Sequence, residues 1–237
     1  MRLTITGFFI TLGAVIATAS GAAADKIEAH RAAIDDGATP PIWNSWYVGA
    51  SVGYGWGESD YYLAQAGHGA ATNRPSGFAG SLMAGRNWQF PNRVVLGIEG
   101  DLGLMDLTDQ RHWRDDHLFK SQFGPFWATL RGRAGYLWSN RLLLFATAGA
   151  AFLETDETVL GAGEGEANPG QTSPNRNFHL GWVAGLGAEY AYSERLSAKL
   201  EYLHMDFDQF QSRNGNGSLY TFEDHIDLWR VGVNYKF

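Results

Sequence analysis

The last nine residues of the chain alternate between apolar and polar side chains without a break. One face carries Trp229, Val231, Val233, Tyr235 and Phe237, and the other carries Arg230, Gly232, Asn234 and Lys236. A period of two is typical of a β-strand whose faces meet different environments. Because the apolar face is crowded with aromatic rings, we expect a barrel wall with lipid outside and a polar interior.

The same strand-like pattern recurs upstream. We expect strands at 46–57, 77–89, 94–105, 124–138, 141–154, 178–192, 195–208 and 225–237. Each has about 10 to 15 residues, close to what a tilted strand needs to cross a membrane. The sequence does not show which side chains from Leu142 to Phe152 face inward, because that stretch does not alternate regularly between apolar and polar residues. The pattern predicts an all-β fold, an eight-stranded antiparallel up-and-down transmembrane β-barrel.

The connections between these strands alternate in length. Short ones are expected at 90–93, 139–140 and 193–194, and long ones at 58–76, 106–123, 155–177 and 209–224. Short turns at one rim and long loops at the other are typical of bacterial outer-membrane barrels. The even strand number places both barrel termini on the periplasmic side and the long loops outside the cell.

The N-terminal segment is predicted to be an export signal. Arg2 precedes an uncharged stretch from Leu3 to Ala24, which ends in three alanines. We therefore divide the chain into a signal peptide (1–24), a flexible periplasmic extension (25–44) and the barrel (45–237). The alternative to the signal peptide is an uncleaved anchor helix. The alternative to the flexible extension is a partner-binding helix at 25–36. The exported chain has no cysteine, so its fold has no disulfides.

Charges of both signs fall on the predicted inner face. An interior of eight strands is just wide enough for side chains to fill, and a buried charge there must be paired. We expect a structural network of ion pairs that fills the lumen, made of Glu99, Asp101, Arg131, Arg133, Glu189, Lys199, Glu201 and Arg230. The alternative is a catalytic or ion-conducting site.

Aromatic residues gather near the ends of the predicted strands. Tryptophan and tyrosine rings are enriched where barrels meet the lipid headgroups. We expect a girdle formed by Trp46, Trp56, Trp88, Tyr136, Trp138, Tyr190, Trp229 and Tyr235. Ordinary β-propensity also enriches aromatic residues, but it does not explain their position at strand ends.

Four stretches carry a resemblance to a known family. They are Trp46 to Gly49, Leu130 to Tyr136, Ala198 to Leu203 with Asp206 and Phe207, and Val231 to Phe237. The chain resembles the small OmpA/OmpX-like outer-membrane barrels of Gram-negative bacteria, specifically the porin-family surface antigens of rhizobia-like alphaproteobacteria. The resemblance covers about residues 45 to 237 and the signal peptide. It implies that Phe237 is read by the outer-membrane assembly machinery.

These observations predict a non-enzymatic surface protein of the cell outer membrane that contributes to envelope structure. The expected partners are outer-membrane lipid, lipopolysaccharide and the assembly machinery, and the oligomeric state stays open. The net charge of −7 argues against nucleic acid. No catalytic residue, cofactor or metal is expected, although His112 and His117 could ligate metal or haem. A surface receptor for haem or a host molecule, a narrow pore and a lipid-modifying enzyme remain alternatives.

Overall fold

The computed structural model describes residues 41–63, 70–113, 117–160, 175–213 and 219–237. These residues form nine β-strands: β1 (Trp46–Leu63), β2 (Ala70–Asn73), β3 (Ser76–Gln89), β4 (Val94–Trp113), β5 (His117–Ser139), β6 (Leu142–Leu160), β7 (Asn175–Ala191), β8 (Leu196–Arg213) and β9 (Leu219–Lys236). No helix in this described part is long and apolar enough to span a membrane.

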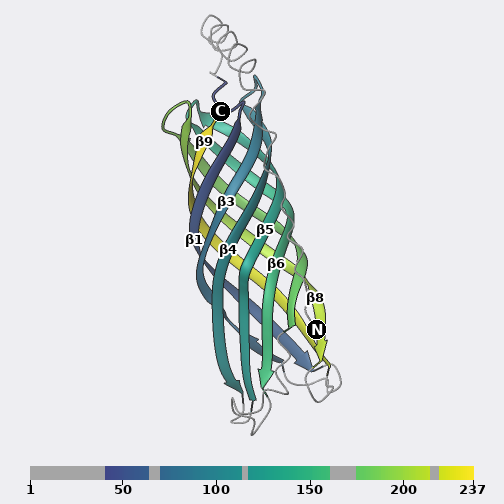
Figure 1. Ribbon diagram of the computed structural model, residues 1–237. Coiled ribbons are helices and arrows are strands. Elements are labelled where there is room, and N and C mark those ends of the chain that lie inside the picture. Colours follow the sequence, from purple (N-terminus) through teal and green to yellow (C-terminus); the bar gives the residue numbers. More distant parts are fainter. Residues whose placement is uncertain (1–40, 64–69, 114–116, 161–174, 214–218) are drawn as a thin grey trace, which may run out of the picture. The chain divides into compact units, whose positions relative to one another are not determined.

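Each strand from β3 onward pairs with the next, and the sheet closes on itself. All pairings are antiparallel, and β1 pairs with β9 from Tyr47–Lys236 to Leu63–Tyr220. Figure 1 shows the first and last strands side by side in the closed wall. The predicted antiparallel up-and-down barrel is therefore confirmed.

The short strand β2 does not add a ninth wall element. It pairs with β1 in the same register as β3 does, so β2 and β3 form one ladder interrupted at Arg74 and Pro75. Pro75 has no backbone N–H to give to a ladder, but its carbonyl accepts from Gly57 N at 2.8 Å. The barrel wall thus contains eight strands, as predicted.

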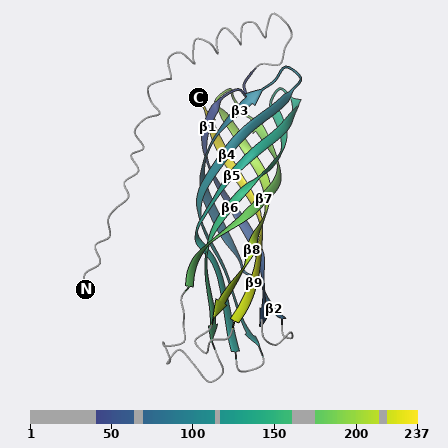
Figure 2. The same cartoon turned by 90° about the vertical axis from the view of Figure 1, so that its right-hand side faces the viewer.

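The barrel has two different ends. At the turn end, drawn uppermost in Figures 1 and 2, the strands are joined through 90–93, 140–141 and 192–195. The opposite end is called the loop end. Strand boundaries at the turn end agree with the predicted ones to within one residue.

The predicted long loops are partly wrong. The strands continue well past the expected limits at the loop end, and β4 runs to Trp113 instead of residue 105. There, Thr108 to Trp113 pair with Gln122 to His117 of β5. The sequence predicted loops because these stretches are rich in Gly, Asn, Asp, Ser and Thr, but a ladder between two strands can also carry such residues. The residues left between strands are 64–69, 114–116, 161–174 and 214–218.

The N-terminal boundary also needs correction. The signal peptide (1–24) and residues 25–40 of the predicted extension lie outside the described residues. The compact barrel unit begins at Ile42, inside the stretch predicted to be a flexible extension. Trp43 is completely buried, so this part of the extension belongs to the barrel.

The strand of uncertain facing, β6, alternates regularly. Leu143, Phe145 and Thr147 are buried in the lumen, whereas Leu144 and Phe152 are exposed on the outer wall. Sequence could not separate the two faces because both are apolar. The inner face of β6 packs against other apolar groups, and the outer face does not.

Candidate functional site

A layer of charged side chains fills the middle of the barrel. It contains all eight residues predicted for the lumen: Glu99, Asp101, Arg131, Arg133, Glu189, Lys199, Glu201 and Arg230. They come from β4, β5, β7, β8 and β9, and each is at most 5% exposed. Four carboxylates meet four cations, so the layer is electrically balanced. We call these eight residues the charge layer.

Arg131 lies at the centre of the charge layer. Its guanidinium contacts three carboxylates: Nη2 donates to Glu99 and, at 2.6 Å, to Asp101 Oδ2, and Nη1 donates to Glu201 Oε1 at 2.8 Å. Its Nε donates to Thr129 Oγ1 at 3.1 Å. Bonds of this charge-assisted kind are about twice as strong as neutral ones, so Arg131 ties β4, β5 and β8 together.

Arg230 on β9 closes the same network from the other side. Its Nη1 lies 2.6 Å from Asp101 Oδ1, and its Nη2 lies 2.5 Å from Glu201 Oε2. Glu201 and Arg230 are direct cross-strand neighbours, whereas Asp101 is on a distant strand. The ion pairs therefore join neighbouring strands and also opposite parts of the wall.

The ion-pair partner of Lys199 could not be predicted from the pairing of neighbouring strands alone. It stands directly opposite Glu189 in the β7–β8 ladder. Its Nζ instead lies 2.8 Å from Glu99 Oε1, 100 residues away in sequence and across the lumen. Glu189 is paired with Arg133, whose Nη2 lies 2.8 Å from Glu189 Oε2. Pairing inside a closed barrel is set by side-chain reach across the interior.

Neutral side chains complete the hydrogen bonding of the buried carboxylates. Tyr47 donates to Glu99 Oε2 at 2.7 Å, and Thr129 donates to Asp101 Oδ2 at 2.8 Å. Glu189 accepts from Ser197 at 2.6 Å and from Asn234 at 3.0 Å. The predicted network did not include these four neutral donors, although strand alternation places them on the inner face. Such bonds offset part of the cost of removing charges from water.

One glycine shows how tightly the layer is packed. A Cβ built on Gly97 would lie 2.4 Å from Asn87 Oδ1 and 3.0 Å from Arg133 Cγ. A side chain at position 97 would therefore displace the Asn87 side chain and the Arg86 backbone oxygen, which lies 2.8 Å away, and would press on Arg133. The arginine also lies with its guanidinium carbon 4.0 Å from the centroid of the Phe145 ring.

An apolar layer closes the turn end of the lumen. It consists of Ile42, Trp43, Val95, Leu137, Leu143, Phe145 and Ala191. Trp43 is held by two hydrogen bonds, from its backbone N to Gln89 Oε1 and from Nε1 to Asn140 O, each 3.2 Å. Lys236 Nζ lies 3.5 Å from the centroid of the indole ring. We call this the turn-end plug.

A larger apolar layer fills the lumen on the loop-end side. Its members are Ala79, Met105, Leu107, Phe123, Trp127, Ala151, Leu153, Val183, Leu203, Met205, Phe207, Ile226 and Leu228. On β4 and β5 the charged residues lie between the two apolar layers in sequence and in space. The expectation of a polar interior is therefore correct only for the middle of the barrel. The alternation of side chains along each strand predicted which positions face inward, but it did not predict how the apolar side chains would pack there.

The outer wall is an apolar band bounded by aromatic rings. All eight predicted girdle residues are at least 40% exposed. By register, six lie toward the turn end (Trp46, Trp88, Tyr136, Trp138, Tyr190 and Tyr235) and two toward the loop end (Trp56 and Trp229). The prediction missed other rings at the loop-end boundary, which include Tyr54, Phe78 and Trp182.

The height of this band matches a bilayer. On β1 the exposed apolar face runs from Trp46 to Trp56. At about 3.3 Å per residue and a strand tilt of about 40°, this stretch rises about 25 Å, the height of the apolar band of outer-membrane barrels. Beyond the band on β4, the outward residues Asp106 and Thr108 are polar and exposed.

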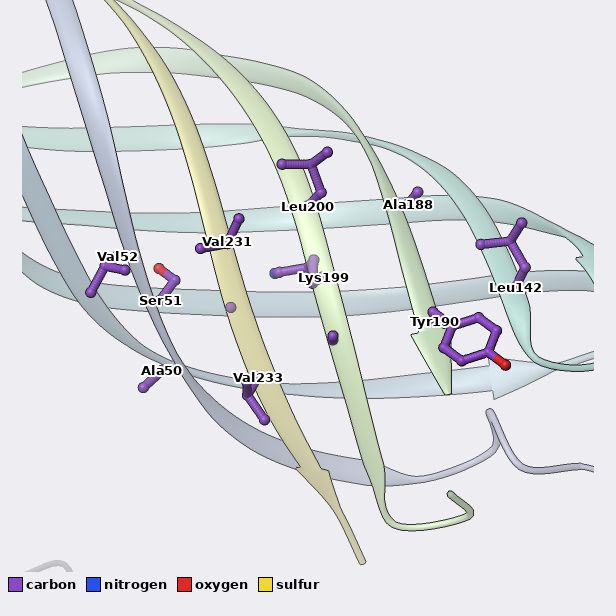
Figure 3. Close-up of a pocket in the computed structure, with 12 residues that line it drawn as sticks. Ala50, Ser51, Val52, Leu142, Ala188, Tyr190, Lys199, Leu200, Val231 and Val233 are labelled. Atoms are coloured by element: carbon purple, nitrogen blue, oxygen red, sulfur yellow. The ribbon is translucent and has the colours of Figure 1, made fainter. Parts of the chain in front are cut away.

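A shallow groove crosses this outer wall (Figure 3). Ala50, Ala188 and Ala198 line it together with larger apolar side chains, which are Val52, Leu142, Tyr190, Leu200, Val231 and Val233. Its polar lining residues Ser51 and Lys199 have buried side chains that bond within the lumen. The groove offers no reactive group to a substrate and belongs to the lipid-facing surface.

Histidine and carboxylate side chains form one small cluster on the outer wall near the loop end. His204 Nδ1 lies 2.8 Å from Asp227 Oδ1, which also accepts from Tyr202 at 2.5 Å. Within the described residues, no group of three or more histidine, cysteine or acidic side chains is arranged to hold a metal ion. The side chains of His112 and His117 lie outside the described part of the chain.

Three comparisons relate this architecture to known proteins. The outer membrane protein beta-barrel domain family matches residues 9–237. The 31 kDa outer-membrane immunogenic protein of Brucella melitensis is 29% identical over 204 residues, covering 82% of this chain and 84% of that protein. The 22 kDa outer membrane protein of Rhizobium leguminosarum bv. viciae is 25% identical over 198 residues, covering 82% and 78%.

Among solved structures, Ail of Yersinia pestis covers 81% of this chain and 99% of its own, at 13% identity and a TM-score of 0.43. The family match spans the entire described barrel and is the finding that decides the classification. The chain belongs to the outer membrane protein beta-barrel domain family and is an outer-membrane β-barrel protein of Gram-negative type.

Proposed function

We propose that the barrel is a closed, non-enzymatic component of the outer membrane that supports envelope structure and exposes its loop end to the outside. The observation that carries this proposal is the filled lumen. A balanced layer of eight buried charges lies between two apolar layers. A pore would need a hydrated path, whereas these side chains bond to one another.

The proposed orientation places the turn end in the periplasm. Short turns lie on the periplasmic side of bacterial outer-membrane barrels. Both ends of the wall, Trp46 and Phe237, lie at the turn end, where Phe237 N donates to Trp46 O at 2.9 Å. A cysteine placed at Asn92 should react with a membrane-impermeant maleimide only after the envelope is permeabilised. Labelling in intact cells would contradict this orientation.

The loop end supports a role at the cell surface. On β4 the strand continues from Asp106 to Trp113 beyond the apolar band, a length of about 25 Å along the strand. The relatives named outer-membrane immunogenic proteins are consistent with a surface that antibodies reach. We propose that these projecting strands present the external face of this protein. Binding of antibodies raised against residues 106–113 to intact cells tests this exposure.

The outer-wall histidine does not favour the enzymatic alternative. His204 is oriented by Asp227, as a catalytic base would be, but a hydrolase also needs a nucleophile within hydrogen-bond reach. Among the described residues, no serine hydroxyl is bonded to His204. Lipid A extracted from cells with and without the protein should give identical mass spectra.

Phe237 keeps its proposed role as the assembly signal. Its ring is 61% exposed and packs edge-on against Tyr235, with centroids 5.2 Å apart. An exposed terminal ring is available to the assembly machinery before the barrel closes. Deleting Phe237 should lower the amount of folded barrel in the outer membrane while leaving refolding into detergent intact.

Reconstitution into planar bilayers tests the closed state. We expect no steady current from the wild-type barrel, because all three layers of the lumen are filled by packed side chains. A water-filled porin inserted under the same conditions is the positive control. A steady ohmic current that Glu99→Gln or Arg131→Ala alters would show an ion path through the charge layer and overturn the proposal.

A further inference from the structure

One arginine differs from those of the charge layer because it stands on the outer wall. Arg86 is on β3, where strand alternation places it on the same face as Leu82 and Trp88. Leu82 is 71% exposed and Trp88 is 41% exposed, so this face is the lipid-facing one. Arg86 lies three residues before the end of β3, at the depth of the turn-end aromatic girdle.

Two indole rings flank its guanidinium. The guanidinium carbon lies 5.5 Å from the centroid of the Trp46 ring and 5.8 Å from that of Trp88. Trp46 faces Arg86 directly in the β1–β3 ladder, and Ile98 faces it on the other side. The rings restrict where the guanidinium can lie and keep it at one depth.

This guanidinium has no anionic protein partner among the described residues. Arg131, Arg133 and Arg230 each lie within 2.8 Å of at least one carboxylate oxygen. Aromatic rings attract the positive charge of Arg86 but leave its N–H donors available. A cation on the lipid-facing wall is unfavourable unless it reaches an anionic group or water at the interface.

We infer that Arg86, Trp46 and Trp88 form a binding site for the phosphate group of a membrane phospholipid. A guanidinium presents parallel N–H donors that match two oxygens of a phosphate. The rings of Trp46 and Trp88 contact the glycerol and upper acyl region, where indoles prefer to lie. The assignment to a phospholipid of the periplasmic leaflet rests on the proposed orientation of the barrel.

Native mass spectrometry of the folded barrel in detergent tests the site. The probe is dioctanoylphosphatidylglycerol, and dioctanoylglycerol is the matched lipid without phosphate. We expect Arg86→Gln to weaken binding of the first lipid by about tenfold and to leave the second unchanged. Trp88→Leu, which keeps the charge and removes one ring, should weaken it about threefold.

Arg141→Gln is the matched control, because Arg141 is an exposed arginine at the same end of the barrel. It should bind the phospholipid as the wild type does. Equal losses in Arg86→Gln and Arg141→Gln would indicate general charge attraction and overturn the inference. Heat-modifiable gel migration verifies that each variant is folded before binding is measured.

Two further measurements distinguish a lipid phosphate from a free phosphate ion, and the phosphate site from the proposed orientation of the barrel. Equimolar inorganic phosphate should not displace the lipid; displacement would indicate a free-anion site and contradict the inference. Because binding is measured in detergent, it does not depend on orientation. Labelling at Asn92 in intact cells, together with lost binding in Arg86→Gln, would contradict the proposed orientation of the barrel. It would still support the phosphate site at Arg86.

Discussion

Replacing Arg131 with methionine is expected to lower the free energy of unfolding by about 3–5 kcal/mol, the usual cost of leaving buried charges unpaired. The substitution leaves Glu99, Asp101 and Glu201 around an apolar side chain of similar length. Lys199 and Arg230 still contact these carboxylates but cannot balance all three. Urea unfolding in phospholipid vesicles, followed by tryptophan fluorescence, measures the loss.

A surface ion pair supplies the control for Arg131. Arg74 Nε lies 2.8 Å from Glu58 Oε1, and the two side chains are 64% and 35% exposed. Because water screens such a pair, Arg74→Met should cost at most about 1 kcal/mol. Equal effects of the two substitutions would show that the charge layer is hydrated and would contradict a sealed lumen.

A second variant separates charge imbalance from lost packing. Adding Glu201→Gln to Arg131→Met restores equal numbers of positive and negative groups in the charge layer. We expect the double variant to recover at least about 1 kcal/mol relative to Arg131→Met, because coupled sites are not additive. A further loss in the double variant would indicate that hydrogen-bond geometry, not charge balance, decides the stability.

Placing an arginine on the outer wall should cost about 2–4 kcal/mol at mid-membrane depth. Leu102 is the test position, because it is 66% exposed and lies between Leu82 and Ala128 in the apolar band. Leu102→Arg forces the cation into hydrocarbon or forces the bilayer to thin around it. The measurement is again the free energy of unfolding in vesicles.

The control for Leu102 lies on the same face of the same strand. Thr108 is exposed and stands beyond the apolar band toward the loop end. Thr108→Arg should therefore change stability by less than about 1 kcal/mol. If Leu102→Arg were as mild as Thr108→Arg, Leu102 would not be in contact with lipid.

Sequence parity identified much of the barrel because lipid and lumen demand different side chains. The alternation at Trp229 to Phe237 placed Arg230 inside and Trp229 outside, as the structure has them. The same argument brought all eight residues of the charge layer to the inner face. It could not identify their partners, because Lys199 reaches across the lumen to Glu99 and bypasses its ladder neighbour Glu189.

Other features could not be found from a period of two. Trp43 precedes the first strand, and only the closed barrel shows that it fills the turn end. The loop-end parts of the strands lie in stretches rich in Gly, Asn, Asp, Ser and Thr, so the sequence predicted loops there. The inner face of β6 could not be identified from the sequence, because its residues Leu143 and Phe145 are as apolar as the outward-facing Leu144. Both pack in the turn-end plug.

The facing of β6 gives the most direct test of the central claim, that one face of each strand meets lipid and the other a packed lumen. The chain has no cysteine, so single cysteines can carry nitroxide spin labels at each position from 143 to 150. In bilayers, we predict high oxygen collision rates at Leu144, Ala146 and Ala148 and low rates at Leu143, Phe145 and Thr147. Uniform rates, or the opposite alternation, would contradict the account.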